Sequence, residues 1–239
     1  RQAIVRNVFD SLAYVARGPF VRATGGGIQV TELPFDRDGA RRLLDSLGWT
    51  ARGGDGVRMR EGRMLAFTML APTSSAVRQR MAVLLQQQLS EIGAKVDIES
   101  VEFNAFLEKQ RRRTFDAIFA TWNVDPTPGS IRQTWSSAGI RSDEGSNFGS
   151  YSNPVFDALV DSGAAQMKPD AARGYFQRAY QTILDDAPAI WLYEPRFFAG
   201  AQKRLRLTGL RADGWWVKLP DWYIPAGERT ARDSLGLTP

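Results

Sequence analysis

The sequence predicts an α/β domain in which helices flank one mixed sheet. Helical and extended segments alternate along most of the 239 residues. One succession of strand, helix and strand, over 95–103, 104–113 and 115–122, has the pattern of a parallel crossover. Its last strand is almost continuously apolar, as expected for a strand that is covered on both faces. The length suffices for one large domain or two small ones.

The first part of the chain predicts two helices joined by a long connection. A helical spacing over 1–17 precedes a Gly- and Pro-rich stretch over 18–36. The second helix covers 36–49, with Asp36 as its N-cap and Gly48 at its end. One face of this helix is apolar and carries Leu43, Leu44 and Leu47.

A hairpin and a long helix are predicted next. The hairpin covers 52–70, because the Asp-Gly pair at 55–56 is a turn signal and short extended segments flank the Glu-Gly pair at 61–62. The clearest helix of the chain runs over 74–92, with Gly93 as its C-cap. Its apolar stripe contains Val77, Met81, Leu84, Leu85 and Leu89.

The second half predicts two further helices. The first begins with Ser152 or Asn153 as its N-cap and Pro154 in its first turn. The second covers 169–188 and ends at a proline.

Two strands and an aromatic tail are predicted to close the chain. The strands cover 189–195 and 196–202, and the tail, 210–239, is weakly periodic. The aromatic cluster at 213–225 is compatible with a stacking platform for sugars or bases. We favour a second interpretation, in which the cluster seals the edge of the domain or packs on another domain.

The absence of two residue types excludes several function classes. The chain has no Cys, so disulfides, thiolate nucleophiles, zinc fingers and iron–sulfur clusters are excluded. It has no His, which excludes the Ser-His-Asp triad. Carboxylate-only catalysis and oxygen-ligated cations remain, but the acid pairs at 143–144 and 185–186 lack the spacing of a calcium loop. We therefore predict neither a cofactor nor a metal site.

The net charge of +5 raises the question of a nucleic-acid partner. The one dense basic run, at 109–114, falls at the predicted end of a helix, where cations complement the helix dipole and face solvent. We favour that interpretation over nucleic-acid binding. The sequence has no apolar run long enough for a transmembrane helix and no signal peptide at its start, and a helix already under way there suggests a piece of a longer protein.

The stretch TWNVDPTPG, at 121–129, follows the apolar strand directly. In open α/β sheets ligands bind outside the carboxyl ends of the strands. Asp125 is therefore either a ligand anchor or, because Asp-Pro is common turn chemistry, a turn former. Trp122 is compatible with a ligand-contacting wall or with the core.

Six segments, taken in order, resemble the second half of the bacterial extracellular solute-binding proteins of family 5, the dipeptide- and oligopeptide-binding class of ABC importers. They are PFDRDGARRLLDSLGW, DGVRMREGRMLAFTML, RQRMAVLLQQQLSEIGAKVDIESVEFNAFLEK, FDAIFATWNVDPTP, SNFGSYSNPVFDALVD and YQTILDDAPAIWLY. The resemblance covers about 1–220 and implies a class II periplasmic-binding-protein-like lobe. It implies that 1–239 form the C-terminal ligand-binding lobe of a two-lobed protein whose N-terminal lobe is absent, with 210–239 returning toward that lobe.

The resemblance also implies a binding site. In peptide-binding members a Trp-x-x-Asp segment faces the cleft and its carboxylate pairs with the α-ammonium group of the ligand, a charge-assisted contact. The ligand then adds to the protein as a strand. The positions carried over are Trp122, Asn123, Asp125, Phe103, Tyr193 and Glu194 for ligand contact, and Asn147 and Tyr151 for a mainly structural motif.

One departure bears on the ligand. Several peptide binders have a longer linker before an Asp-Pro pair, whereas here Asp125 is itself followed by Pro126. The family also includes binders of nickel chelates, sugars and opines.

The resemblance implies a receptor rather than an enzyme. Such a receptor binds a small solute or short peptide outside the cytoplasm and delivers it to the membrane permease of an ABC importer. The alternatives are a non-peptide solute or, from a different class, a carboxylate-only hydrolase that would use Asp125 and Glu194 as a pair.

Overall fold

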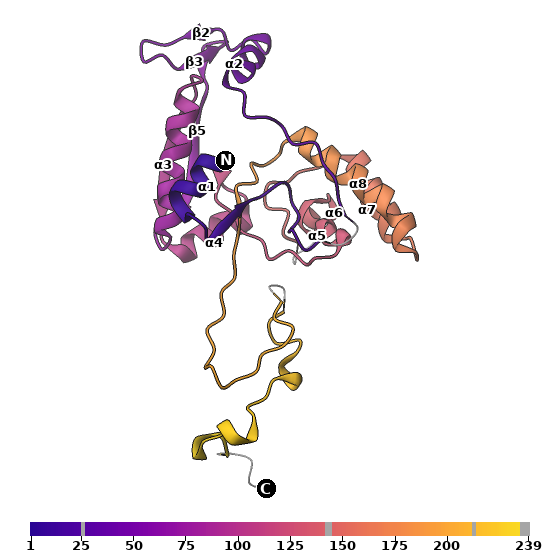
Figure 1. Cartoon of the computed structure of the whole chain (residues 1–239). Helices are drawn as coiled ribbons and strands as arrows, with labels where there is room; N and C mark the ends of the chain where they lie inside the picture. The colour runs from indigo at the N-terminus through magenta and orange to yellow at the C-terminus, as the bar shows by residue number, and fades with distance from the viewer. Residues whose placement is uncertain (25–26, 142–144, 212–213, 235–239) are drawn as a thin grey trace. The chain divides into compact units, whose positions relative to one another are not determined.

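The computed structural model describes residues 1–24, 27–141, 145–211 and 214–234. The chain divides into two compact units, Arg1–Glu194 and Pro195–Pro239. The first unit contains the helices and the sheets, and the elements are labelled in Figure 1. The predicted α/β class is confirmed.

A three-stranded parallel sheet is the framework of the first unit. β5 (Ala66–Pro72) lies between β6 (Lys95–Val101) and β7 (Ala117–Ile118), and both neighbours run parallel to it. α3 (Ala76–Ser90) connects β5 to β6, and α4 (Phe103–Arg112) connects β6 to β7. The predicted crossover is therefore parallel, but β5 lies between its two strands.

Helices α1 (Gln2–Phe9) and α3 cover this sheet (Figure 1). α3 begins where predicted, because the Ser75 side chain accepts a hydrogen bond from the backbone N–H of Arg78. After it, Gly93 has a φ of +89°, which a residue with a Cβ adopts only with strain. The buried apolar residues between the helices and the sheet are Ile4, Met69, Ala71, Met81, Ala82, Leu85, Val96 and Phe119.

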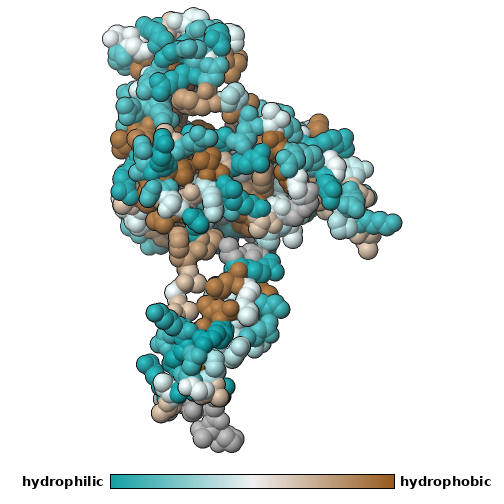
Figure 2. All heavy atoms as spheres, viewed as in Figure 1, coloured by the Kyte–Doolittle hydropathy of each residue, from teal (hydrophilic) through white to brown (hydrophobic). Residues whose placement is uncertain are grey.

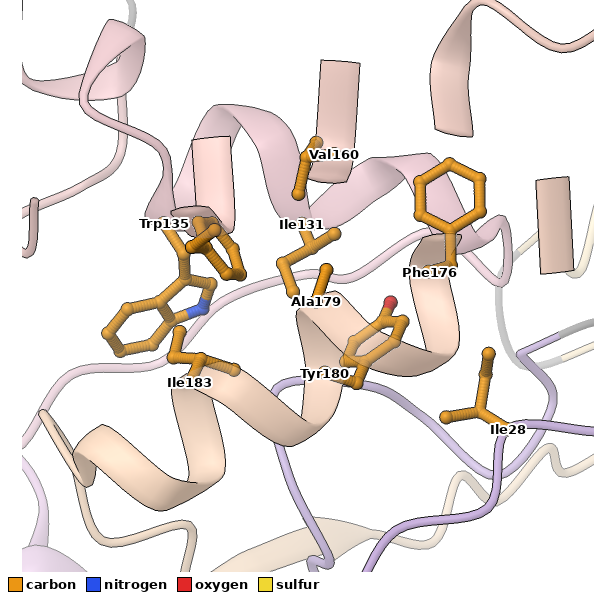
Figure 3. Close-up of a cluster of buried hydrophobic side chains, with 9 residues drawn as sticks. Ile28, Ile131, Trp135, Val160, Phe176, Ala179, Tyr180 and Ile183 are labelled. Atoms are coloured by element: carbon orange, nitrogen blue, oxygen red, sulfur yellow. The ribbon is translucent and has the colours of Figure 1, made fainter. Parts of the chain in front are cut away.

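A second core lies among helices. Its elements are α5 (Ile131–Trp135), α6 (Ala138–Arg141), α7 (Pro154–Ala164) and α8 (Pro169–Asp186). Figure 3 shows side chains from α5, α7 and α8 converging, with Ile28 added by the extended segment that precedes α2. The buried members are Ile28, Ile131, Trp135, Phe156, Val160, Phe176, Ala179, Tyr180 and Ile183.

The predicted hairpin forms a small antiparallel sheet of β2 (Ala51–Arg52), β3 (Arg58–Arg60) and β4 (Arg63–Met64). The predicted helix beside it is α2 (Arg37–Ser46), and its Asp36 cap is confirmed by a hydrogen bond from the Gly39 N–H. The apolar face expected for this helix is not covered by the described part of the chain. Leu43 and Leu47 are 61% and 52% exposed, and Leu44 is half-buried.

The predicted helix over 1–17 is too long. α1 ends at Phe9, where Asp10 has a φ of +52°. The residues that follow form β1 (Ala13–Val15), which pairs with β8 (Tyr193–Pro195). Pairing with a strand distant in sequence outweighs the local helical spacing here.

The predicted strands at the other end are shorter or absent. Only Tyr193–Pro195 of the expected strand over 189–195 is extended in a sheet, and no strand forms over 196–202. Phe197 and Phe198 are each 70% exposed, so their apolar pattern reflects an uncovered segment. The strand expected over 115–122 is reduced to β7. The strands therefore form three small sheets rather than one mixed sheet.

The second unit consists of loops and the 3-10 helices η2 (Leu219–Asp221), η3 (Ala226–Glu228) and η4 (Ala231–Ser234). The backbones of Arg206 and Tyr223 form a bridge within it. Figure 2 shows apolar residues on its surface among hydrophilic ones. The large side chains of this unit that are about half-exposed include Trp215, Trp216, Val217, Leu219 and Tyr223. In the described parts of both units, no helix is long and apolar enough to cross a membrane.

Candidate ligand-binding site

The carboxyl ends of the three parallel strands define one edge of the sheet. Pro72 at the end of β5 pairs with Val101 at the end of β6, and Leu70 pairs with Ile118 at the end of β7. The chain that leaves β7 passes through Trp122 and Asp125 before η1 (Pro128–Ser130) and α5. The predicted strand-end position of this loop is therefore confirmed.

A pocket of about 340 Å³ lies beside the loop. Residues 123–125 line it, together with 132–134 on α5 and 138–139 on α6. Its volume is at the lower end of the range for small-molecule sites, about 300–1,000 Å³. The pocket brings together two of the predicted positions, Asn123 and Asp125.

The Asp125 carboxylate is exposed and makes no hydrogen bond or ion pair with any described residue. An aspartate that forms a turn usually accepts a hydrogen bond from the backbone two residues on. Asp55 does so in this chain, with its carboxylate 3.1 Å from the Val57 N. Asp125 does not, so its carboxylate is available to a ligand.

Trp122 does not line the pocket. Its indole N–H donates to the Ser146 carbonyl, with 3.0 Å between the two atoms. The ring centroid is 5.3 Å from that of Trp135 and 6.0 Å from that of Phe148. Half-buried against the helical core, Trp122 fixes the start of the loop that carries Asp125.

Phe103 lies at the same edge of the sheet but outside the pocket. It is the first residue of α4, which begins where β6 ends. Its ring is 42% exposed and stacks on Phe106 with centroids 6.4 Å apart.

Tyr193 and Glu194 do not line the pocket of Asp125 either. The Tyr193 ring packs 4.3 Å from Phe9, and burial raises the pKa of its hydroxyl. The Glu194 carboxylate accepts a hydrogen bond from the backbone N–H of Arg22, with 3.1 Å between oxygen and nitrogen. Both side chains are thus engaged near the start of the chain.

Asn147 and Tyr151 have the structural contacts that were expected of them. Asn147 is 1% exposed, donates to the carbonyls of Trp135, Ser136 and Tyr151, and accepts from the Tyr151 N–H. The Tyr151 hydroxyl donates to Asp186, and its burial together with this contact raises its pKa.

Sequence reasoning missed the α5 side of the pocket. Arg132, Gln133 and Thr134 line the pocket from a helix of only five residues. One signal was present, because Ile131 and Trp135 are apolar and four residues apart, so both face the core on one side of a helical turn. The residues between them therefore face away from the core.

No group of three or more acidic side chains that could hold a metal ion occurs in the described ranges. The charged lining residues of the pocket, among those described, are Asp125 and Arg132. Opposite charges on one pocket wall are suited to ion pairs and hydrogen bonds.

The fold is that of periplasmic-binding-protein-like solute-binding proteins. The structure of the oligopeptide-binding protein AppA from Bacillus subtilis, in complex with a nonapeptide, superposes with a TM-score of 0.79 at 24% identity and covers 94% of this chain and 45% of that one. The structure of NikZ from Campylobacter jejuni, in complex with Ni(L-His), gives a TM-score of 0.76 at 20% identity and covers 92% of this chain and 45% of that one.

The chain belongs to the bacterial extracellular solute-binding proteins, family 5, because residues 1–142 match the model of the Middle part of that family. In sequence, it is 28% identical to the oligopeptide-binding protein AppA of Bacillus subtilis (strain 168) over 200 residues. That match covers 82% of this chain and 36% of the relative, so the chain spans about a third of the relative's length.

Proposed function

We propose that this chain is the C-terminal ligand-binding lobe of a two-lobed receptor for short peptides. The receptor would bind its ligand outside the cytoplasm and deliver it to the membrane permease of an ABC importer. Family membership supports the transport role, and the 36% share of the AppA sequence supports a second lobe elsewhere in the protein.

A single observation carries the peptide assignment: the Asp125 carboxylate lines a pocket at the carboxyl edge of the sheet and has no partner among the described residues. A peptide offers an α-ammonium group that would form a charge-assisted hydrogen bond with it. The backbone of the loop would pair with the ligand as an added strand. The AppA structure contains a nonapeptide, which supports the same ligand class for this fold.

A non-peptide solute is the second candidate. The NikZ structure contains Ni(L-His), so the same fold accommodates a metal chelate. Asp125 would then meet the ammonium group of an amino-acid ligand rather than that of a peptide.

The hydrolase alternative has little support. A glycosidase needs two carboxyl groups that face each other across the substrate. Glu194 does not line the pocket of Asp125 and is held by the Arg22 backbone. We therefore propose a binding protein without catalytic activity.

The second unit supports the two-lobed proposal. Trp215 and Trp216 are 55% and 58% exposed, and large exposed apolar patches usually mark interfaces. We propose that residues 210–239 pack on the other lobe of the protein.

Native mass spectrometry of the full-length protein, as purified, tests the proposed function. Denaturation should release a mixture of short peptides. A single released non-peptide species would keep the transport role and replace the ligand class. An empty protein that binds neither peptides nor small solutes on addition would contradict the proposal.

A further inference from the structure

The pocket beside Asp125 carries two opposite charges. Asp125 lies in the loop after β7, and Arg132 lies on the first turn of α5. Every other described lining residue is uncharged, and Asn123 and Thr134 add an amide and a hydroxyl. A site that needed only the ammonium group of a ligand would gain nothing from a guanidinium on its wall, because like charges repel.

The Arg132 guanidinium uses only part of its hydrogen-bonding capacity within the protein. Its Nε lies 2.8 Å from the Oδ1 of Asp161 on α7, and the two side chains are 53% and 61% exposed. Exposed ion pairs of this kind contribute little to stability. The guanidinium has five N–H donors, of which Asp161 takes one, so an anionic ligand group can bind to the remaining donors.

Asp125 and Arg132 line the same small pocket, so one ligand unit can contact both residues. A cavity of about 340 Å³ accommodates a fragment of amino-acid size rather than a long peptide. The ammonium group and the anionic group must then belong to the same unit. In a peptide, that unit is a first residue with an acidic side chain, because the terminal carboxylate lies farther along the ligand.

We propose that this pocket selects ligands whose amine-bearing unit also carries an anionic group, with Asp125 binding the ammonium and Arg132 the anion. Peptides that begin with Asp or Glu are the expected ligand class. The inference rests on the proposed function and adds a specificity-determining residue to it. Asp161 then competes with the ligand for Arg132.

The competition predicts opposite effects for the two members of the ion pair. Arg132→Gln removes the anion-binding group, whereas Asp161→Asn removes its competitor. If the pair only stabilised the fold, both variants would act in the same direction. Arg173→Gln is the matched control, because Arg173 forms a similarly exposed pair with Asp170 on α8 and does not line the pocket.

Isothermal titration of the full-length protein with Glu-Ala-Ala and Gln-Ala-Ala tests the inference. The two peptides differ in charge and hardly in shape. We expect the wild type to bind Glu-Ala-Ala about tenfold more tightly, as a charge-assisted hydrogen bond predicts. Arg132→Gln should abolish this preference, Asp161→Asn should increase it, and Arg173→Gln should leave it unchanged.

The outcomes separate the inference from the function on which it rests. Equal affinity of the wild type for both peptides would overturn the inference and leave the peptide receptor intact. Absence of binding to either peptide, with no peptide released from the purified protein, would overturn the peptide receptor. Free glutamate distinguishes the source of the anion. Tight, Arg132-dependent binding of glutamate without any peptide would retain the charge recognition and assign it to a single amino acid.

Discussion

The loops that carry Asp125 and Asn147 both adjoin the same aromatic cluster, yet they treat their polar groups in opposite ways. Asn147 is buried and makes four hydrogen bonds, to the carbonyls of Trp135, Ser136 and Tyr151 and from the Tyr151 N–H. Asp125 is exposed and makes none to the described residues. A polar group whose hydrogen bonds are all made within the protein stabilises a loop, whereas one without a protein partner on a pocket wall is available to bind a ligand.

The largest expected effect tests the role of Asp125 in ligand recognition. Asp125→Ala should weaken peptide binding to the full-length protein by about 2–5 kcal/mol, because the ligand ammonium loses its charged partner. The free energy of unfolding should change by less than about 0.5 kcal/mol, since no described contact is lost. Titration calorimetry and denaturant unfolding measure the two quantities. Unchanged affinity would show that Asp125 only shapes the loop, and Asp97→Ala, at an exposed β6 position, is the control.

The second effect in size tests the contribution of Asn147 to stability. Asn147→Ala removes four hydrogen bonds; the Ser136 carbonyl keeps the Gly139 N–H, but the carbonyls of Trp135 and Tyr151 and the Tyr151 N–H lose the Asn147 partner, so the free energy of unfolding should fall by about 2–3 kcal/mol. Urea unfolding followed by tryptophan fluorescence measures the loss. Asn123→Ala is the matched control, because Asn123 is exposed on the pocket wall and should leave stability unchanged. If Asn147→Ala lost no more stability than Asn123→Ala, the hydrogen bonds of Asn147 would not stabilise its loop.

The smallest expected effect tests whether Trp122 stabilises the fold or contacts the ligand. Trp122→Phe keeps a ring against Trp135 but removes the N–H that donates to the Ser146 carbonyl. We expect a loss of about 1 kcal/mol in stability and little change in peptide affinity. A large loss of affinity with unchanged stability would instead make Trp122 a ligand-contacting wall, as the resemblance implied.

Local signals predicted the helices well and the strands less well. The predicted N-caps at Asp36 and Asn153 are short-range features, and both side chains accept hydrogen bonds from the first turn of their helix. β1 was missed and only the last three residues of the strand predicted over 189–195 form β8, because the two strands pair with each other across about 180 positions of the chain.

The candidate site was predictable in part for the same reason. The strand-end rule places Asp125 correctly because it depends on one strand and the loop after it. Tyr193 and Glu194 belong to β8, and their side chains contact Phe9 and the Arg22 backbone rather than the pocket. Arg132 was not predicted as a site residue, because a helix of five residues is too short to show a periodic pattern.

Arg58 has a consequence for the motions of the protein. It is 2% exposed, and its guanidinium bonds to Asp45 at the end of α2, to the Trp49 carbonyl and to the Ile92 carbonyl after α3. Because α2 buries no residue of its own, polar contacts hold it to the rest of the unit, and the Arg58 guanidinium is the buried one among them. The amides of α2 and of β3 should therefore exchange with deuterium as a single cooperative opening, and Arg58→Lys should raise the exchange rate of both together while the amides of β5 remain protected.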